Sequence, residues 1–252
     1  MENIPSPEEL YTYYSRYEYG SERYLSPLTI KSWNLLLDEF EKYRNTNKLL
    51  DVGCGRGQFL EQAKKRGWEV YGTEYSEKAL EICQQKGITM QAGQLKAALY
   101  TEKDFDVITS FEVMEHINNP HKDLKEINHL LRRGGLFYCT TPNFNSLLRY
   151  YLKADYNIIE YPEHLLYYTK ATLNKIVSEH NFKPIKFLST GISLNQRTST
   201  KVQAIEEKLS KDEILRENID SKWYLTLAKA LVNKIFTLTN LGITLKGYYT
   251  KP

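Results

Sequence analysis

The chain has 252 residues, with 34 lysines and arginines against 31 aspartates and glutamates, and a formal net charge of +3. This length suits one α/β domain with additions, and the dispersed charge does not indicate a nucleic-acid partner. The three cysteines lack metal-ligand spacing, the first residues lack an apolar leader and no stretch is apolar enough for a membrane span, so we expect a cytoplasmic protein.

The first 45 residues are expected to form helices over about 7–17 and 27–43 and to act as a lid. Six of the 20 tyrosines lie between positions 11 and 24. A tyrosine offers a flat apolar ring with a polar tip, which suits packing over a ligand or in a partly wet core. We expect Tyr14 and Tyr17 to contact a cofactor, because a helix places residues three apart on one face.

Residues 46–190 are expected to form an α/β core, because apolar runs alternate there with helical patterns. The expected strands are 48–52, 68–74, 88–92, 105–110 and 136–141, and the expected helices are 58–66, 76–85 and 121–131. Short connections predict right-handed crossovers and a Rossmann-like, doubly wound, mostly parallel sheet.

The last part of the chain is expected to complete a seven-stranded sheet. Thr169 is predicted to cap a helix that runs to His180, and a strand is predicted at 182–189. Residues 191–241 are expected to be a helical insertion, and 242–252 the last strand, in an antiparallel arrangement. The apolar positions of the insertion suit either a core contact or a homodimer face. The whole of 1–252 is therefore interpreted as a single domain.

The segment LLDVGCGRGQFL places a glycine-rich turn between an apolar strand and a helix. Asp51 ends the strand, and Gly53, Gly55 and Gly57 follow. Glycine permits a sharp turn and lets a ligand approach the backbone. Glu74 ends the next apolar strand, where its carboxylate can accept hydrogen bonds from ribose hydroxyls. Together these two features predict a site for a nucleoside-containing cofactor.

Gln58 stands where a dinucleotide fingerprint carries its third glycine, so a pyrophosphate is not the expected ligand. The segment DVGCGRG instead resembles motif I of class I S-adenosylmethionine-dependent methyltransferases, and Glu74 lies at the ribose-binding position of that family. FDVITSFEVMEHINNP and LLRRGGLFYCTTPN are similar to the fourth- and fifth-strand motifs of one branch. That branch holds ubiquinone-biosynthesis O-methyltransferases and many methyltransferases of sugar and surface-polysaccharide pathways. The matching segments lie within about 48–143.

The resemblance implies S-adenosylmethionine as cofactor and S-adenosylhomocysteine as product. Where many relatives have Gly-Asp after the third strand, this chain has Gly93-Gln94, so the adenine is expected at the backbone near Leu95 and at the Gln94 amide. Including the two lid tyrosines, the predicted cofactor-binding residues are Tyr14, Tyr17, Asp51, Gly53, Cys54, Gly55, Gly57, Glu74, Tyr75, Gln94, Leu95, Ser110 and Phe111.

Candidate catalytic residues follow the fourth strand, because ligands of such a sheet lie beyond the carboxyl ends of its strands. His116 is predicted to be the general base, since an imidazole takes up a proton near neutral pH. A structural Glu-His pair is the alternative, and Glu115 is a second candidate for the base or for a group that orients His116. His164 is predicted to position the acceptor, and its alternative is a loop histidine bonded to backbone.

No HExxH or paired-cysteine pattern is present, so no metal site is predicted. The chain also lacks the Pro-Cys dipeptide of cytosine-C5 methyltransferases and the Asn/Asp-Pro-Pro-aromatic motif of enzymes that methylate amino groups of nucleic acids. Both absences favour a small-molecule acceptor over nucleic acid.

We therefore expect an enzyme that methylates an oxygen of a small polar acceptor, such as a sugar or another precursor of a cell-surface glycan or capsule. A quinone-pathway phenol and the nitrogen of an amino sugar are alternative acceptors. A nicotinamide-dependent oxidoreductase and a non-catalytic methyltransferase-like binding subunit are the alternatives from other classes.

Overall fold

The computed structural model describes residues 5–15, 25–100, 104–153, 156, 158, 159, 163–191 and 223–252. Tyr17 and most of the predicted insertion lie outside these residues. Within them, no helix is both long and apolar enough to cross a membrane.

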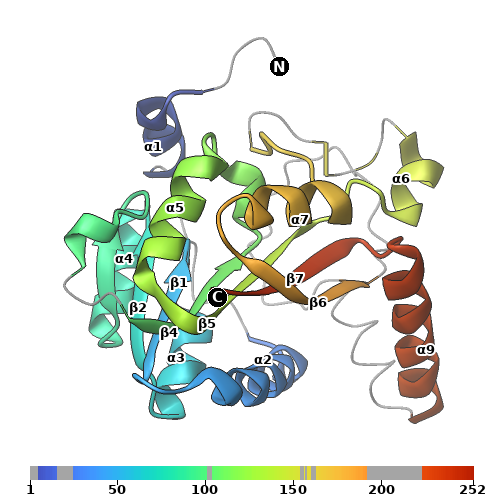
Figure 1. The fold of residues 1–252 in the computed structure, drawn as a ribbon, viewed down its shortest axis with the longest axis horizontal. Coiled ribbons are helices and arrows are strands. Elements are labelled where there is room, and N and C mark those ends of the chain that lie inside the picture. Colours follow the sequence, from blue (N-terminus) through green and yellow to red (C-terminus); the bar gives the residue numbers. More distant parts are fainter. Residues whose placement is uncertain are drawn as a thin grey trace.

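A seven-stranded sheet forms the centre of the molecule, in the order β3-β2-β1-β4-β5-β7-β6 (Figure 1). The strands are β1 (Lys48–Val52), β2 (Glu69–Glu74), β3 (Thr89–Ala92), β4 (Phe105–Phe111), β5 (Leu131–Pro142), β6 (Lys183–Thr190) and β7 (Thr244–Thr250). The first five strands pair in parallel, whereas β7 pairs antiparallel with both β5 and β6. The predicted Rossmann-like sheet with an antiparallel last strand is confirmed.

The helices connect these strands and precede them. They are α1 (Pro7–Ser15), α2 (Pro27–Phe40), α3 (Gln58–Lys65), α4 (Glu77–Gln85), α5 (Pro120–Leu130), α6 (Leu147–Leu152), α7 (Lys170–Ser178) and α9 (Trp223–Thr239), with 3-10 turns η1 (Glu41–Tyr43), η2 (Ala97–Leu99) and η3 (Met114–His116). Thr169 caps α7 as expected, because its side chain accepts from the Thr172 amide and forms a capping box with that residue.

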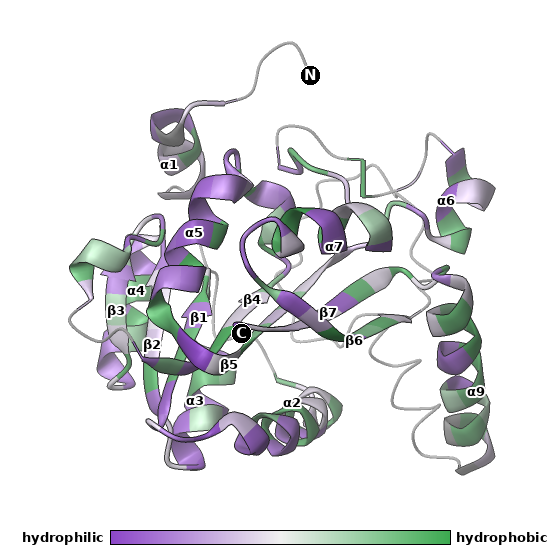
Figure 2. Cartoon of the chain, viewed as in Figure 1, coloured by the Kyte–Doolittle hydropathy of each residue, from purple (hydrophilic) through white to green (hydrophobic). Residues whose placement is uncertain are grey.

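Apolar side chains cover both faces of the sheet, which gives a three-layer core. On one face, α2 contributes Leu37 and Phe40, and α3 contributes Phe59 and Leu60. On the other face, α5 and α7 contribute Leu124, Ile127, Leu173 and Val177. Figure 2 shows the strands between these helices as mostly apolar or neutral and the outer sides of α4 and α5 as hydrophilic. Burial on both faces explains why the central strands read as nearly continuous apolar runs.

The structure differs from the sequence prediction at the start of β5 and around α6 and α9, which lie on the right in Figure 1. Strand β5 begins at Leu131 rather than at 136, and α6 was not predicted. Within the described part of the predicted insertion, the structure has one helix, α9, which packs beside the edge strand β6.

Candidate active site

The turn between β1 and α3 has a left-handed backbone at each of its glycines. The φ angles of Gly53, Gly55 and Gly57 are +68°, +52° and +68°, a region that residues with side chains rarely adopt. A Cβ atom at Gly53 would also lie 2.6 Å from Cγ2 of Val113. The turn thus needs glycine both for its backbone conformation and for the close approach of the segment after β4.

Glu74, at the end of β2, holds this turn in place. Its Oε2 atom accepts a hydrogen bond from the Gly55 amide at 2.8 Å. Its Oε1 atom accepts from the amides of Tyr75 and Ser76 at 2.8 and 3.2 Å. A buried carboxylate is stabilised by such amide donors. Glu74 therefore connects the glycine turn to the start of α4.

A cavity lies at the carboxyl ends of β1, β2 and β4, and it brings together eight of the predicted site residues. These are Tyr14, Gly53, Glu74, Tyr75, Gln94, Leu95, Phe111 and His116. The other lining residues are Leu10, Val52, Thr73, Gly93, Glu112, Val113, Ile117, Asn118 and Asp123. The predicted location of the site, beyond the ends of the parallel strands, agrees with this cavity.

Asp51 does not line the cavity. Its Oδ1 atom accepts a hydrogen bond from the Thr109 hydroxyl at 2.7 Å, inside the sheet between β1 and β4. Burial raises the pKa of Asp51 to about 7, and the nearby Glu74 carboxylate adds to the increase. Side chains alternate along a strand, so Val52 lines the cavity where Asp51 does not.

Several other predicted residues lie near the cavity without lining it. Gly55 and Gly57 shape the glycine turn, and Cys54 donates its amide hydrogen to the Thr73 carbonyl at 3.0 Å. Ser110 is buried in β4, and its hydroxyl has no hydrogen-bond partner among the described residues.

Gln94 and Asp123 form a pair that the sequence did not reveal. The Gln94 side-chain amide donates a hydrogen bond to Oδ1 of Asp123, which comes from α5. Burial raises the pKa of Asp123 to about 6. Because the two residues are brought together by packing of α5 over the sheet, no local sequence signal marks Asp123.

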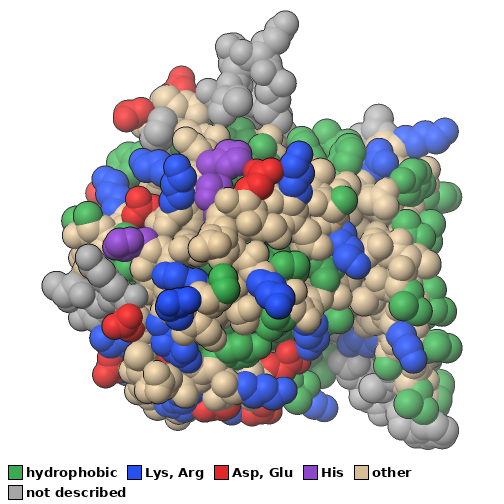
Figure 3. All heavy atoms as spheres, viewed as in Figure 1, with side chains coloured by type: hydrophobic (Ala, Val, Ile, Leu, Met, Phe, Trp, Pro, Cys, Tyr) green, Lys and Arg blue, Asp and Glu red, His purple; other side chains and the backbone are tan. Residues whose placement is uncertain are grey.

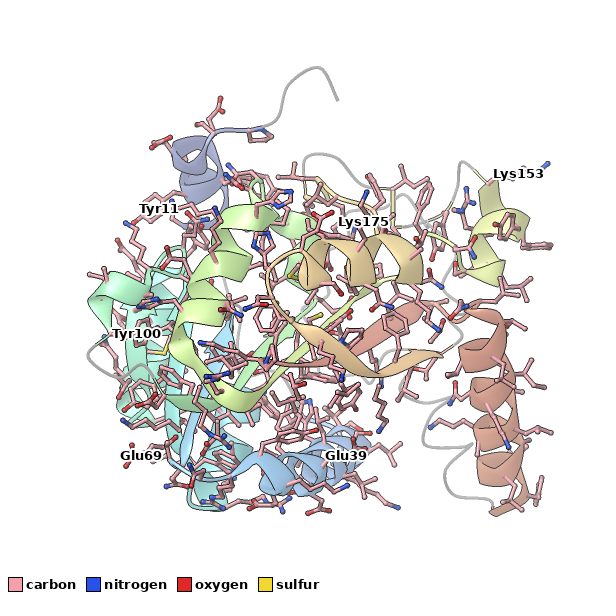
Figure 4. All side chains as sticks on the ribbon, in the orientation of Figure 1. Tyr11, Glu39, Glu69, Tyr100, Lys153 and Lys175 are labelled. Carbon is pink, nitrogen blue, oxygen red and sulfur yellow. The ribbon has the colours of Figure 1, made fainter. Side chains whose placement is uncertain are left out.

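Helix α1 reaches the cavity through Leu10 and Tyr14. The Tyr14 hydroxyl lies 3.0 Å from Nδ1 of His116 and donates to the Glu163 carbonyl at 3.3 Å. Burial raises the pKa of Tyr14, so its hydroxyl stays protonated. Tyr11, labelled in Figure 4, lies on the same helix, with its ring centroid 6.1 Å from that of Tyr75.

His116 ends η3 and is held mainly by the segment that precedes α7. Its Nδ1 atom lies 2.6 Å from the carbonyl oxygen of Glu163. Its ring lies edge-on to that of His164, with centroids 4.8 Å apart. Burial lowers the pKa of His116, so the ring is neutral at neutral pH.

Glu115 is buried beside His116, and its environment favours the protonated acid. Its Oε2 atom accepts from the Thr141 hydroxyl at 2.9 Å, and its backbone carbonyl accepts from the amides of Leu165 and Leu166. Burial, followed by the effect of the Glu112 carboxylate, raises the pKa of Glu115 to about 8. These contacts attach η3 to the segment that carries His164.

One atom from each of Glu115, His116 and His164 lies within 4.8 Å of the others, close enough to hold a metal ion. The Nδ1 atom of His164 lies 2.7 Å from the Ile158 carbonyl oxygen, and Nδ1 of His116 is occupied in the same way by Glu163. Backbone partners on Nδ1 leave the Nε2 atoms as the available nitrogens. The sequence prediction, which found no metal motif, did not anticipate this grouping.

Comparison with known proteins assigns the chain to a family. Over residues 23–186, more than half of its length, it matches the family described as a methyltransferase domain. The ubiquinone biosynthesis O-methyltransferase of Aeromonas salmonicida is 32% identical over 105 residues, which are 39% of this chain and 44% of the relative. The enzyme of the same name from Ruegeria pomeroyi is 35% identical over 104 residues, covering 39% and 42%. The match thus spans less than half of the length of these two curated relatives.

Solved structures share the fold at low sequence identity. A SAM-dependent methyltransferase from Archaeoglobus fulgidus has a TM-score of 0.59 and 20% identity, and the alignment covers 89% of this chain and 93% of the other. The phosphoethanolamine N-methyltransferase 2 of Haemonchus contortus, solved with S-adenosyl-L-methionine, has a TM-score of 0.56 and 18% identity, with 98% and 57% covered.

The fold, the glycine turn and Glu74 define a class I S-adenosylmethionine-dependent methyltransferase. The chain belongs to the methyltransferase domain family that it matches over 23–186. The cavity also fits the cofactor of that class by its chemistry. Glu74 suits ribose hydroxyls, Leu95 and Ile117 supply apolar surface for a base, and Gly53 leaves the backbone of the turn accessible.

Proposed function

We propose that the chain transfers the methyl group of S-adenosylmethionine to an oxygen of a small polar acceptor. The observation that carries this proposal is His116, a neutral imidazole that lines the cavity beside the glycine turn and is held at Nδ1. When bound, S-adenosylmethionine supplies a methyl group on a sulfonium, which is already a good leaving group. The remaining tasks of the protein are to orient the acceptor and to accept its proton.

In this mechanism the acceptor hydroxyl gives its proton to Nε2 of His116. The positive charge formed on the ring is stabilised by donation from Nδ1 to the Glu163 carbonyl. Oε1 of Glu115 lies 3.8 Å from Nε2, too far for a hydrogen bond to the neutral ring. His164, which packs against the same ring, is proposed to position the acceptor.

For the acceptor, we favour a sugar or another precursor of a cell-surface glycan or capsule. Glu112 and Asn118 line the cavity close to His116 in sequence, and such side chains form hydrogen bonds with hydroxyl groups. A quinone-pathway phenol is the second candidate, favoured by the names of the curated relatives. Methylation of an amino-sugar nitrogen is a further variant of the same chemistry.

The experiment measures S-adenosylhomocysteine formed with nucleotide sugars, free sugars, amino sugars and catechols as acceptors. Turnover with a hydroxylated sugar supports the favoured acceptor. Turnover with catechols alone would instead identify a quinone-pathway phenol as the acceptor. Calorimetry with S-adenosylmethionine and with a nicotinamide cofactor is the companion measurement. Binding of S-adenosylmethionine without turnover on any acceptor would favour the non-catalytic subunit.

We also propose that residues 1–45 act as a lid over the cofactor. Leu10 and Tyr14 of α1 line the cavity, which supports this role. The lid would exclude water from the reacting atoms and hold His116 through the Tyr14 hydroxyl.

A further inference from the structure

Helix α5 places an acidic side chain among its buried residues. Its outer face carries exposed basic and histidine side chains, which Figure 3 shows where Figure 1 places the helix. Its buried residues are Pro120, Asp123, Leu124, Ile127 and Leu130. Asp123 is only 4% exposed. Burying a carboxylate costs free energy unless the group finds partners, so its presence on the inner side of α5 indicates a role other than packing.

One oxygen of the Asp123 carboxylate has a protein partner. Oδ1 accepts a hydrogen bond from the Gln94 side-chain amide, and the carboxylate accepts no other hydrogen bond from the residues that the structure describes. Burial raises the pKa of Asp123 to about 6, so the group is still mostly an anion at neutral pH. Asp123 also lines the cavity. Oδ2 is therefore an acceptor that a donor on a bound ligand can meet.

Gln94 lies beside Asp123 in the cavity but has both ends of its amide engaged. Its nitrogen donates to Asp123, and its Oε1 atom lies 3.5 Å from Nζ of Lys122. These two contacts fix which way the amide faces. In this arrangement the acceptor available to a ligand is the carboxylate of Asp123, and not the oxygen of Gln94.

The part of the cavity near Asp123 is apolar and begins beside Glu74. The Gly93 amide donates to the Glu74 carbonyl at 2.7 Å, so the loop that carries Leu95 starts next to the end of β2. Leu95 and Ile117, which are 1 and 8% exposed, line the cavity. With the ribose at Glu74, the base attached to it reaches these apolar side chains. Adenine has apolar faces and an amino group at its edge, so it needs apolar walls and one acceptor.

Asp123 is the lining carboxylate that lies at this apolar end. Burial, followed by the charge of Asp123, raises the pKa of Tyr75 to about 12, which places the Asp123 carboxylate close to the residue after Glu74. Glu112 also lines the cavity, but its amide donates to the Thr140 carbonyl at 3.1 Å, at the far side next to β5.

We propose that Oδ2 of Asp123 accepts a hydrogen bond from the exocyclic amino group of the cofactor's adenine, and that Asp123 thereby selects adenine over bases with an oxygen at that position. A carboxylate accepts from an amino group, whereas it faces an oxygen as acceptor against acceptor. The inference deepens the proposed function at its cofactor. It rests on S-adenosylmethionine as cofactor, and not on the sugar acceptor or on His116 as base.

The test is calorimetry of the full chain with S-adenosylhomocysteine and with S-inosylhomocysteine, in which an oxygen replaces the amino group. The wild type should bind the inosyl compound at least about tenfold more weakly, because the buried carboxylate then loses its donor. The variant D123N keeps the shape of the side chain. Gln94 should still donate to its oxygen, which turns the new amide nitrogen toward the ligand, so the preference for the adenosyl compound should disappear or reverse.

The matched control is E126Q on the same helix. Glu126 is a carboxylate outside the cavity lining, and its Oε2 atom accepts from the Ala97 amide. This variant should keep the wild-type preference. Glu74→Ala should weaken binding of both compounds by the same factor, because both contain the same ribose.

Equal affinity of the wild type for the two compounds overturns the proposal, and this comparison needs no variant to fold. A wild-type preference that D123N retains in full also overturns it, as does an equal loss of preference in E126Q. Because no acceptor is present in these titrations, their result is independent of whether a sugar is methylated, which separates this test from that of the proposed function.

Discussion

The Nδ1 atom of His116 lies 2.6 Å from the backbone carbonyl oxygen of Glu163, 47 residues further along the chain. A carbonyl oxygen accepts hydrogen bonds and never donates, so Nδ1 carries the hydrogen, and Nε2 of the neutral ring carries the lone pair. The tautomer that a general base requires is therefore set by a backbone atom. A substitution of the Glu163 side chain keeps this backbone carbonyl and therefore should keep the tautomer of His116.

Replacing His116 by alanine should lower kcat by a factor of about 10²–10⁴ with little change in cofactor affinity, because a general base acts in the transition state. Burial lowers the pKa of His116 from 6.5, so the wild-type rate should fall only at a pH below that value, where the ring becomes protonated. Rates are measured across pH for the wild type, the variant and the exposed-histidine control His121→Ala. Near-wild-type rates at every pH would remove His116 from the mechanism.

His164→Ala should mainly raise the KM of the acceptor, because a positioning group contributes similarly to the ground and transition states. The measurement is steady-state kinetics with varied acceptor at saturating cofactor. A fall in kcat as large as that of His116→Ala, with KM unchanged, would instead place His164 in the chemical step.

Replacing Glu74 by alanine should weaken binding of S-adenosylmethionine by about 1.5–3 kcal/mol, a factor of roughly ten to a hundred. The substitution removes the acceptor for the ribose and leaves the Gly55 amide without its carboxylate partner. Calorimetry checks this, with Glu69→Ala as control, since Glu69 is an exposed carboxylate at the opposite end of the same strand. Equal affinities of the two variants would contradict the role of Glu74.

Replacing Tyr14 by phenylalanine removes the hydroxyl contacts to His116 and Glu163 but keeps the ring in the cavity. Loss of a net hydrogen bond corresponds to a decrease in kcat of about two- to tenfold, with cofactor affinity nearly unchanged.

Deletion of the residues before Ser26 should weaken cofactor binding while the sheet stays folded, as followed by circular dichroism. Unchanged affinity after the deletion would make α1 a structural cap only.

Turnover is expected to be unaffected by a chelator, because the proposed base is Nε2 of His116 and the mechanism uses no metal. The grouping of Glu115, His116 and His164 makes this a sharp test. The rate is measured after dialysis against EDTA and again after addition of Mg²⁺ or Zn²⁺. Loss of activity that a metal ion restores would assign Nε2 to coordination and refute proton transfer to it.

Asp51 should make the chain less stable as pH rises. Burial raises its pKa in the folded state to about 7 from the ordinary 3.8, so its contribution is fully present below the ordinary value and is lost as pH increases through 7. The unfolding temperature of Asp51→Asn should therefore decline less between pH 5 and 8 than that of the wild type. The exposed-carboxylate variant Asp104→Asn should keep the wild-type slope.

The sequence predicted the parts of the site that depend on local pattern. Three glycines with positive φ and an acidic residue at the end of the next strand are close in sequence, and two of these residues, Gly53 and Glu74, line the cavity. The Asp51 side chain bonds to Thr109 between β1 and β4 and does not line the cavity, because strand side chains alternate, a periodicity that the sequence itself contained.

The partners of the candidate base could not be read from sequence. The carbonyl of Glu163 reaches His116 only because the amides of Leu165 and Leu166 bond to the Glu115 carbonyl. Backbone groups carry no residue-specific signal, so such a contact emerges only from the packed fold. Asp123 is similar, since its pairing with Gln94 depends on how α5 crosses the sheet.

The position of β7 between β5 and β6 also constrains the order in which the sheet can be assembled during synthesis. Strands β1 to β5 can pair as they leave the ribosome, because each pairs with strands that precede β6 in the chain. Strands β5 and β6 can pair with β7 only after Thr244–Thr250 has been synthesised. The free edge of β5 therefore stays unpaired while residues 143–243 are made. An open edge of this kind pairs readily with other nascent chains. A stall in translation before residue 244 would therefore leave an intermediate with five paired strands and an edge exposed to aggregation.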